Sequence, residues 1–191
     1  MVIGLEAAHT DAFDFVFNVH RDYVYKLVRA LLRNPQDAED VTQEVFLRVY
    51  KALPSYRPEC ASMRTWLSRL AVNACQTHRR RNFLRGLLHH NSGEEAMLDL
   101  MDPSPLAAPE DHAMHNELRR TVREVVARLG QEHRTVLVLR YYMDLSCSEI
   151  AVVLECPEGT VHSRLHYARR VVQAQLERHS PRPTTRGEVK K

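Results

Sequence analysis

The 191-residue sequence predicts an all-α protein built from two small helical domains joined by a flexible linker. Apolar residues recur at three- and four-residue steps over two long stretches, the spacing that puts them on one face of a helix. No stretch alternates apolar and polar residues as β-strands do. Between the stretches, roughly 29 residues lack periodicity, which is too long for an ordinary loop. We expect domains at residues 11–83 and 113–179, a linker at 84–112 and a disordered tail at 180–191.

The first domain is expected to hold three helices. The first runs from Asp11 to Leu32, with Thr10 as its candidate N-cap. Asn34 followed by Pro35 ends that helix and starts the second, because asparagine caps helices and proline fits their first position. The second helix should end near Leu53.

A polar loop, Ser55 to Ser62, leads into the third helix. Trp66 is expected to face inward there, and the helix continues into the basic residues His78 to Arg81. Tyr56 lies in the loop beside an arginine, where an aromatic ring can stack on an unpaired base. Three helices with short connections predict a compact domain.

The second domain begins with a helix through Leu118 to Leu129, and Gly130 is expected to close it as a C-terminal cap. Another helix covers about Gln131 to Tyr142. Ser146 and Glu149 have the spacing of a capping box, in which each side chain satisfies an amide at the helix start.

The capping box opens a short helix that ends at Leu154. Pro157 and Gly159 predict a tight turn, and Thr160 is expected to open the last helix, which runs to Glu177. A short helix, a turn and a longer helix have the proportions of a helix-turn-helix. The alternative is a solvated basic helix in an ordinary bundle.

The last predicted helix turns its apolar side inward and leaves polar and basic side chains outside. Arginine can bond guanine edges in the major groove, and the other side chains can reach bases or phosphates. This pattern favours binding to duplex DNA. The candidate residues are Thr160, His162, Ser163, Arg164, His166, Tyr167, Arg169 and Arg170.

Composition limits the other possibilities. The formal net charge of +3 is too small to indicate nucleic-acid binding by itself. The four cysteines lack the spacing of a disulfide framework or a zinc site. Neither a signal peptide nor a run of about 18 apolar residues is present, so we expect a cytoplasmic protein that does not insert into membranes. We also expect no cofactor and no metal.

Three stretches resemble extracytoplasmic-function (ECF) sigma factors, the transcription initiation factors of bacterial RNA polymerase. Asp37 to Phe46 is similar to the region-two motif, and Thr65 to Asn73, followed by His78 to Arg81, is similar to the minus-ten recognition segment. Glu149 to Arg169 is similar to the region-four helix-turn-helix. The resemblance covers nearly the whole chain apart from both ends and the linker.

The resemblance implies that region two binds the clamp helices of the largest subunit of core RNA polymerase. It also implies that region two melts and captures the minus-ten promoter element, while region four reads the minus-35 element as duplex. The implied polymerase-binding residues are Asp37, Asp40, Gln43, Glu44 and Phe46. The implied minus-ten residues are Tyr56, Arg57, Met63, Arg64, Asn73, His78, Arg79, Arg80 and Arg81.

The resemblance further implies restraint by an anti-sigma factor. Phe46, Leu53 and Val153 are its candidate apolar docking points, although core packing is the simpler interpretation of each. A stand-alone helix-turn-helix regulator is the alternative function. An enzyme or metal protein built on the eleven histidines ranks last, because no nucleophile or ligand constellation accompanies them.

Overall fold

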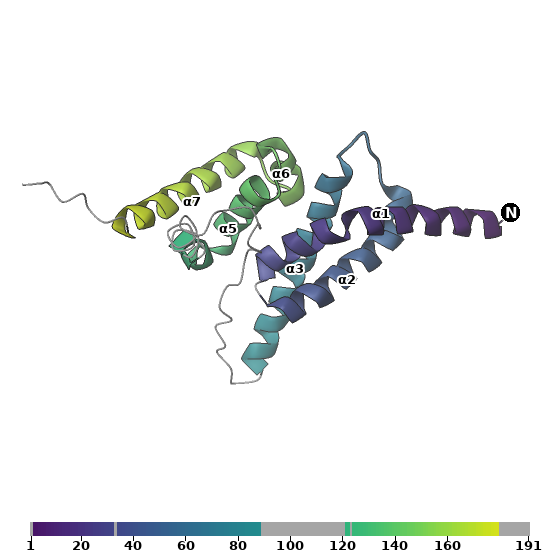
Figure 1. The fold of residues 1–191 in the computed structure, drawn as a ribbon, viewed down its shortest axis with the longest axis horizontal. Coiled ribbons are helices and arrows are strands. Elements are labelled where there is room, and N and C mark those ends of the chain that lie inside the picture. The colour runs from purple at the N-terminus through teal and green to yellow at the C-terminus, as the bar shows by residue number, and fades with distance from the viewer. Residues whose placement is uncertain (1, 33, 89–120, 123, 180–191) are drawn as a thin grey trace, which may run out of the picture.

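The computed structural model describes residues 2–32, 34–88, 121–122 and 124–179. Every regular element in these ranges is a helix, so the all-α prediction is confirmed (Figure 1). The predicted tail at 180–191 and the predicted linker from residue 89 onward lie outside the described residues.

The first unit consists of three long helices. They are α1 (Val2–Leu32), α2 (Pro35–Ala52) and α3 (Met63–Leu88), and the 3-10 turn η1 (Leu53–Ser55) follows α2. Each of the three helices packs against the other two. Their shared core is rich in valine and leucine, including Val24, Leu27, Val45 and Leu67, which have no exposed surface.

The start of α2 confirms the predicted cap. The Asn34 side-chain oxygen accepts a hydrogen bond from the Gln36 amide at 2.9 Å, and Pro35 occupies the first turn. The cap satisfies an amide that has no partner inside the helix. It therefore fixes where the chain turns from α1 into α2.

Two predicted boundaries of the first unit are wrong. The helix α1 begins at Val2 rather than Asp11, so Thr10 lies inside the helix and is not its cap. Good helix formers such as Leu5, Glu6 and Ala7 precede Thr10 and favour continuation of the helix. At the other end, α3 continues to Leu88 and includes five residues that were expected to begin the linker.

The second unit consists of α5 (Gln131–Leu137), the π-helical turn η2 (Val138–Tyr142), α6 (Cys147–Leu154) and α7 (Glu158–His179). Residues 121–122 and 124–128 are also helical. The helix predicted at Gln131 to Tyr142 is thus present, with a π turn as its second half.

The capping box of α6 is confirmed. The Ser146 side chain accepts from the Glu149 amide, and the Glu149 carboxylate accepts from the Ser146 amide at 2.9 Å. The predicted glycine turns are wrong. Gly130 has φ −54° and is the N-cap of α5, whereas the left-handed residue of the helix-turn-helix is Glu155, with φ 52°.

The last helix also starts earlier than predicted. Gly159 lies within the first turn of α7, which begins at Glu158 rather than Thr160. The Pro157 carbonyl accepts from the Thr160 amide at 2.9 Å. Because Glu155 already reverses the chain, glycine is not needed for the turn.

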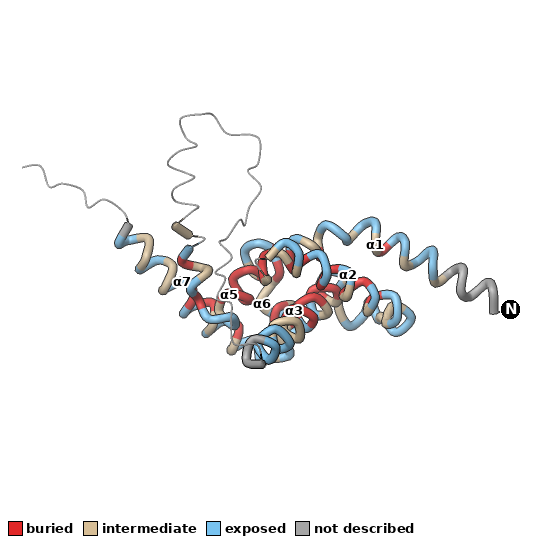
Figure 2. Tube along the Cα trace, turned by 90° about the horizontal axis from the view of Figure 1, so that it is seen from below, coloured by how far each residue is buried: buried red, intermediate tan, exposed pale blue. Residues whose placement is uncertain are grey.

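The two units lie against each other through α3 and α6. Figure 1 shows α1, α2 and α3 at one end of the molecule and α5, α6 and α7 at the other. In Figure 2, buried segments of α3 and α6 lie at the centre of the molecule. Ile150 and Val153 of α6 are at most 1% exposed and belong to the same buried cluster as Leu67 and Val72 of α3.

Candidate functional site

The predicted polymerase-binding residues lie along α2. Asp40 and Gln43 are exposed. Glu44 is partly buried and makes two ion pairs, with Arg48 at 2.5 Å and with Arg81 of α3 at 3.7 Å. With Glu39, which is also exposed, this surface offers a protein partner two exposed carboxylates, an amide and a third carboxylate held in place by arginines.

Phe46 does not lie on the surface. It is 4% exposed, and its ring packs edge-on against Phe17 of α1 at a centroid distance of 4.8 Å. It forms part of the lining of a hollow of about 580 Å³ between α1 and α2, whose rim includes Arg21 and Gln43. Phe46 therefore shapes this hollow from within the core.

The docking points expected for an anti-sigma factor need correction for the same reason. Phe46 and Val153 are buried in the core, and the latter is 1% exposed. Only Leu53, at the end of α2, is half-exposed. A partner cannot reach the two buried side chains without unfolding their surroundings.

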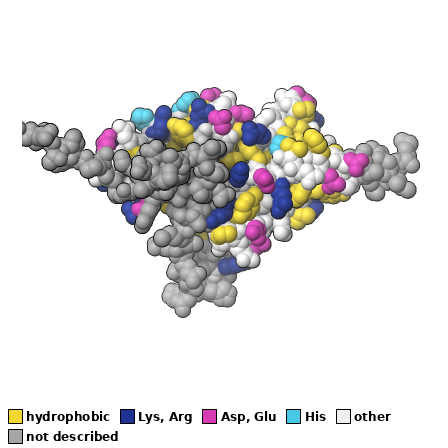
Figure 3. Space-filling view, in the orientation of Figure 1, with side chains coloured by type: hydrophobic (Ala, Val, Ile, Leu, Met, Phe, Trp, Pro, Cys, Tyr) yellow, Lys and Arg dark blue, Asp and Glu magenta, His cyan; other side chains and the backbone are white. Residues whose placement is uncertain are grey.

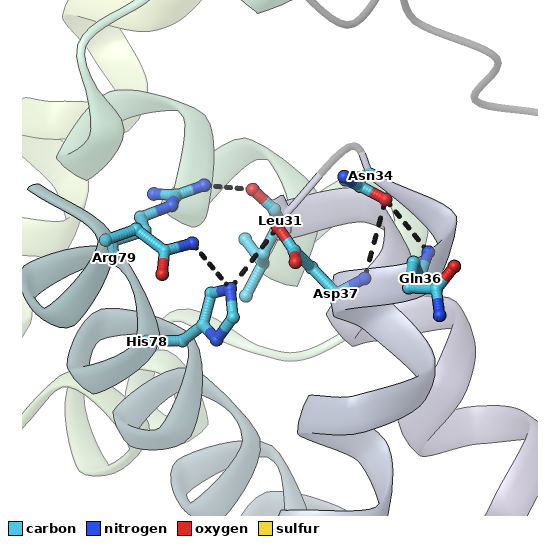
Figure 4. Close-up of polar contacts among 7 residues, drawn as sticks. Leu31, Asn34, Gln36, Asp37, His78 and Arg79 are labelled. Atoms are coloured by element: carbon cyan, nitrogen blue, oxygen red, sulfur yellow. Dashed lines mark hydrogen bonds and ion pairs between the residues drawn. The ribbon is translucent and has the colours of Figure 1, made fainter. Parts of the chain in front are cut away.

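His78 and Arg79 contact the first unit itself. Figure 4 shows both side chains reaching from α3 toward the end of α1 and the start of α2. Arg79 donates to the Leu31 carbonyl at the end of α1. The His78 Nε2 atom lies 3.3 Å from the Asp37 carboxylate and 2.9 Å from the Asn82 amide nitrogen. These contacts tie α3 to the other two helices.

The four basic residues from His78 to Arg81 therefore divide into two pairs. His78 and Arg79 are partly buried, whereas Arg80 and Arg81 are exposed. Arg80 can meet a phosphate backbone directly, whereas Arg81 also pairs with Glu44 of α2 at 3.7 Å. Asp37, predicted to bind polymerase, is paired with His78.

The loop before α3 is held by its own side chains. The Tyr56 ring lies 5.1 Å from the Trp66 ring, and its hydroxyl donates to the Ala61 carbonyl at 3.0 Å. Ser62 accepts from the Thr65 amide at 3.2 Å and so caps the start of α3. Arg57, the next residue along the loop, is exposed. The loop thus presents an aromatic ring and a cation on a fixed support.

The first half of α3 continues this surface. Met63 is half-buried, and the Arg64 guanidinium lies 4.8 Å above the Tyr23 ring centre. Burial raises the pKa of Tyr23, whose hydroxyl lies 2.8 Å from that of Ser68. Asn73 is exposed further along the helix. The predicted minus-ten residues are therefore spread along the loop and along α3 from Met63 to Arg81.

The helix α7 presents the predicted duplex-binding face. Val161, Leu165 and Ala168 face the core, and this leaves the opposite side of the helix outward. The exposed side chains of this part of α7 are His162, Ser163, His166, Tyr167, Arg169 and Arg170, and Arg169 also lines a hollow shared with Leu137 and Tyr141. Thr160 is half-exposed at the start of this face. An exposed face of this kind on the second helix of a helix-turn-helix fits the major groove.

Arg164 differs from its neighbours. Its side chain is only 25% exposed and lies 2.6 Å from the Glu132 carboxylate of α5. Next to it, the His133 ring lies 4.4 Å from the Tyr167 ring. The start of α5 therefore restrains two residues of the predicted DNA face. Neither contact could be predicted from local sequence patterns, because the partners are about thirty residues apart.

Two family models match this chain. Sigma-70 region 2 matches residues 16–83, and Sigma-70, region 4 matches residues 125–174. The chain is 32% identical over 168 residues to the RNA polymerase sigma-H factor of Pseudomonas aeruginosa, covering 87% of this chain and 86% of that protein. It is 32% identical over 170 residues to the ECF RNA polymerase sigma factor SigW of Bacillus subtilis, covering 87% and 89%. The chain belongs to the ECF RNA polymerase sigma factors.

Solved structures show the same fold as this sigma factor. The sigma factor RpoE, in complex with the anti-sigma factor NepR from Bartonella quintana, matches with a TM-score of 0.72 and 16% identity. That match covers 87% of this chain and 97% of the other. CnrH, in complex with the cytosolic domain of CnrY, matches with a TM-score of 0.61 and 24% identity, covering 90% and 91%.

The described part of the sigma factor shows no group of three or more metal-ligating side chains and no helix able to span a membrane. Burial raises the pKa of the Cys75 thiol to about 12. On the face shown in Figure 3, Lys and Arg side chains are interspersed with Asp and Glu.

Proposed function

We propose that this sigma factor directs core RNA polymerase to promoters by reading the minus-35 element with α7 and holding the melted minus-ten element on α3 and the loop before it. The observation that carries the proposal is the outward polar and basic face of α7, supported on Val161, Leu165 and Ala168. A second helix of a helix-turn-helix with such a face is suited to duplex DNA.

In this proposal α2 is the main contact with polymerase. Asp40 and Gln43 are exposed, and Glu44 is oriented by Arg48 and Arg81. Carboxylates on one face complement a basic partner surface and guide its approach. The partner is the clamp-helix segment of the largest polymerase subunit, and Phe46 supports α2 from below.

The minus-ten element binds a second surface of the same unit. Tyr56 and Trp66 supply aromatic rings, Arg57 and Arg64 supply cations, and Asn73 supplies an amide. Stacking on aromatic rings and hydrogen bonds to base edges are how proteins hold unpaired bases. Met63, at the start of α3, contributes an apolar contact to the bases. The exposed Arg80 and Arg81 contact the phosphate backbone of the DNA strand. His78 and Arg79 hold α3 against α2 and α1, and so keep this surface in place.

In this proposal each unit of the chain binds its own part of the promoter. Residues 11–83 bind polymerase and the minus-ten element, residues 113–179 bind the minus-35 element, and the linker at 84–112 connects them. The protein acts in the cytoplasm, where polymerase and promoter meet, and it is a binding factor rather than an enzyme. The structurally similar RpoE and CnrH are both in complex with partner proteins, and RpoE's partner is an anti-sigma factor. An anti-sigma factor that competes with core polymerase for α2 is the corresponding partner here.

Run-off transcription tests this function. Core polymerase, purified sigma factor and fragments of the source genome are combined, and the transcripts are mapped. We expect discrete start sites that appear only when both proteins are present. A chain that produces no transcript with core polymerase, but shifts a DNA fragment alone in a gel, is instead a stand-alone regulator.

A further inference from the structure

The helix α5 packs against the DNA-facing helix α7 (Figure 1). Two consecutive residues of its first turn contact two residues of α7. Glu132 lies 2.6 Å from Arg164, and the His133 ring lies 4.4 Å from the Tyr167 ring. Arg164 and Tyr167 are one helical turn apart, so they are neighbours on one side of α7. On that side the DNA-facing surface is therefore bordered by α5, which is not part of the helix-turn-helix.

The pair formed by Glu132 and Arg164 has little to do with folding stability. The Glu132 side chain is 67% exposed and the Arg164 side chain is 25% exposed. An ion pair with a partner this exposed adds little to the free energy of unfolding, because water and salt screen the attraction. Replacing the Glu132 carboxylate should therefore leave the fold intact. What the pair does determine is the position and the charge of the surface around Arg164.

The pair keeps unused hydrogen-bonding groups. The contact joins the Arg164 Nη2 atom to the Glu132 Oε2 atom. A guanidinium has five N–H donors, and a carboxylate has a second oxygen with its own lone pairs. Donors and an acceptor thus lie side by side at the border of the DNA-facing surface, and the 2.6 Å contact fixes them relative to each other.

A carboxylate beside a guanidinium changes which part of DNA the arginine can approach. Glu132 repels the negatively charged phosphates, so it disfavours a contact between Arg164 and the backbone. The base edges in the major groove carry no net charge. Arg164 is therefore directed toward bases rather than toward phosphates.

One type of base pair matches this pair of side chains. In the major groove, guanine presents the acceptors N7 and O6, and cytosine presents the N4 amino donor next to them. Arginine donates to the guanine atoms, and glutamate accepts from the cytosine amino group. In an adenine–thymine pair the amino donor lies between the two acceptors, so adjacent arginine donors do not match it.

We propose that Glu132 is a specificity-determining residue for the minus-35 element: it keeps Arg164 off the phosphates and, together with Arg164, selects a guanine–cytosine pair. The inference rests on the proposed function, in which α7 enters the major groove. It adds the first turn of α5 to the surface that reads the duplex. The two residues act as a unit, so the effects of removing them are not additive.

The test is a selection by holoenzyme, assembled from core polymerase and the full-length chain, on a promoter library with a randomised minus-35 element. The library is built on a promoter mapped by run-off transcription. Wild type should select guanine–cytosine at one position, and Arg164→Ala should lose that preference. Glu132→Gln, which keeps the size of the side chain but removes its charge, should relax the same preference roughly fivefold and leave the other positions unchanged.

The matched control is Glu177→Gln. Glu177 is an exposed acid near the far end of α7 and accepts a hydrogen bond from Gln173. Its replacement removes the same charge from the same unit, and it should leave every base preference as in wild type. Thermal unfolding of each variant verifies that the fold is intact.

The salt dependence of promoter binding provides an independent arm. Each phosphate contact releases about one counterion and steepens the fall of affinity with salt. Glu132→Gln should steepen it by about one counterion, because Arg164 becomes free to reach the backbone. The double variant Glu132→Gln/Arg164→Ala should return to the wild-type salt dependence, since it has no guanidinium at this position.

Three results would overturn the inference. They are base preferences in Glu132→Gln identical to wild type, a loss in Glu132→Gln that is equal at every position, and an adenine–thymine preference at the position that depends on Arg164. Each of them leaves the proposed function standing as long as wild type yields discrete transcripts with polymerase. If the wild-type holoenzyme shows no base preference anywhere in the minus-35 element, the role of α7 in promoter reading fails, and this inference fails with it.

Discussion

The Glu44 carboxylate lies 3.7 Å from the Arg81 guanidinium, so the proposed polymerase face on α2 and the basic end of α3 are directly joined. Glu44 also pairs with Arg48 at 2.5 Å on its own helix. Removing this carboxylate therefore disturbs two proposed surfaces at once. Asp40, exposed one turn earlier on α2, reports on polymerase binding alone.

Charge reversal on α2 should weaken binding to core polymerase. We expect Asp40→Lys to weaken it roughly tenfold, because a complementary charge becomes a like charge at the interface. Glu44→Lys should weaken it further, since it also repels Arg81. Co-purification and fluorescence titration with core polymerase measure the effect. Asp14→Lys, an exposed acid on α1, is the control and should bind normally.

Substitutions on α7 should weaken recognition of the minus-35 duplex. Arg169→Ala and Arg164→Ala should each cost roughly 1–3 kcal/mol of binding if they contact base edges. Because Glu132 restrains Arg164, Glu132→Ala should reproduce part of the Arg164 loss. Open-complex titrations on promoters with single base changes give the values. Arg178→Ala, exposed on the same helix, should behave like wild type, and an equal loss there would indicate a general charge effect.

The minus-ten surface should be needed for melting rather than for initial binding. Tyr56→Ala removes the ring packed against Trp66, and Asn73→Ala removes an exposed amide of α3. Both variants should still recruit polymerase to the promoter but leave fewer melted thymines for permanganate to modify. Asn18→Ala on α1 is the control. Normal permanganate footprints in both variants would remove Tyr56 and Asn73 from the base-holding surface.

Local sequence signals predicted the parts of the fold whose partners are close along the chain. The Asn34 cap and the Ser146 to Glu149 capping box were both visible, because each bond spans only two or three residues. The outward face of α7 was visible through its periodicity. The glycine signals failed, because Gly130 is the N-cap of α5 and the left-handed residue before α7 is Glu155 rather than Gly159.

The contacts that join helices far apart along the chain could not be predicted from the sequence. Thr65 and Glu149 are 84 positions apart, and Arg79 and the Leu31 carbonyl are 48 apart. No periodicity or cap rule reports on such pairs, because only the packing of the helices brings them together. The resemblance placed His78 and Arg79 on DNA, whereas their packing shows that they also hold the helices of the first unit together.

The Glu149 carboxylate should make the stability of the chain depend on pH in acid. Hydrogen bonds from the Ser146 amide and hydroxyl, and then from Thr65, lower the pKa of Glu149 below its ordinary 4.5. A carboxyl whose pKa is lower in the folded state stabilises the fold fully above pH 4.5, and this contribution is lost as the pH falls through the lowered value. Glu149→Gln lacks the titrating group and therefore lacks this contribution.

The measurement is the difference in melting temperature between wild type and Glu149→Gln across a pH series from neutral into acid. Other carboxylates titrate in both proteins and cancel in the difference. We expect wild type to be the more stable at neutral pH, with the gap narrowing once the pH drops below 4.5. Glu59→Gln, in the exposed loop before α3, is the control for replacing a glutamate by glutamine elsewhere in the chain. A gap between wild type and Glu149→Gln that stays constant into acid would show that the capping carboxylate is not titrating with the fold.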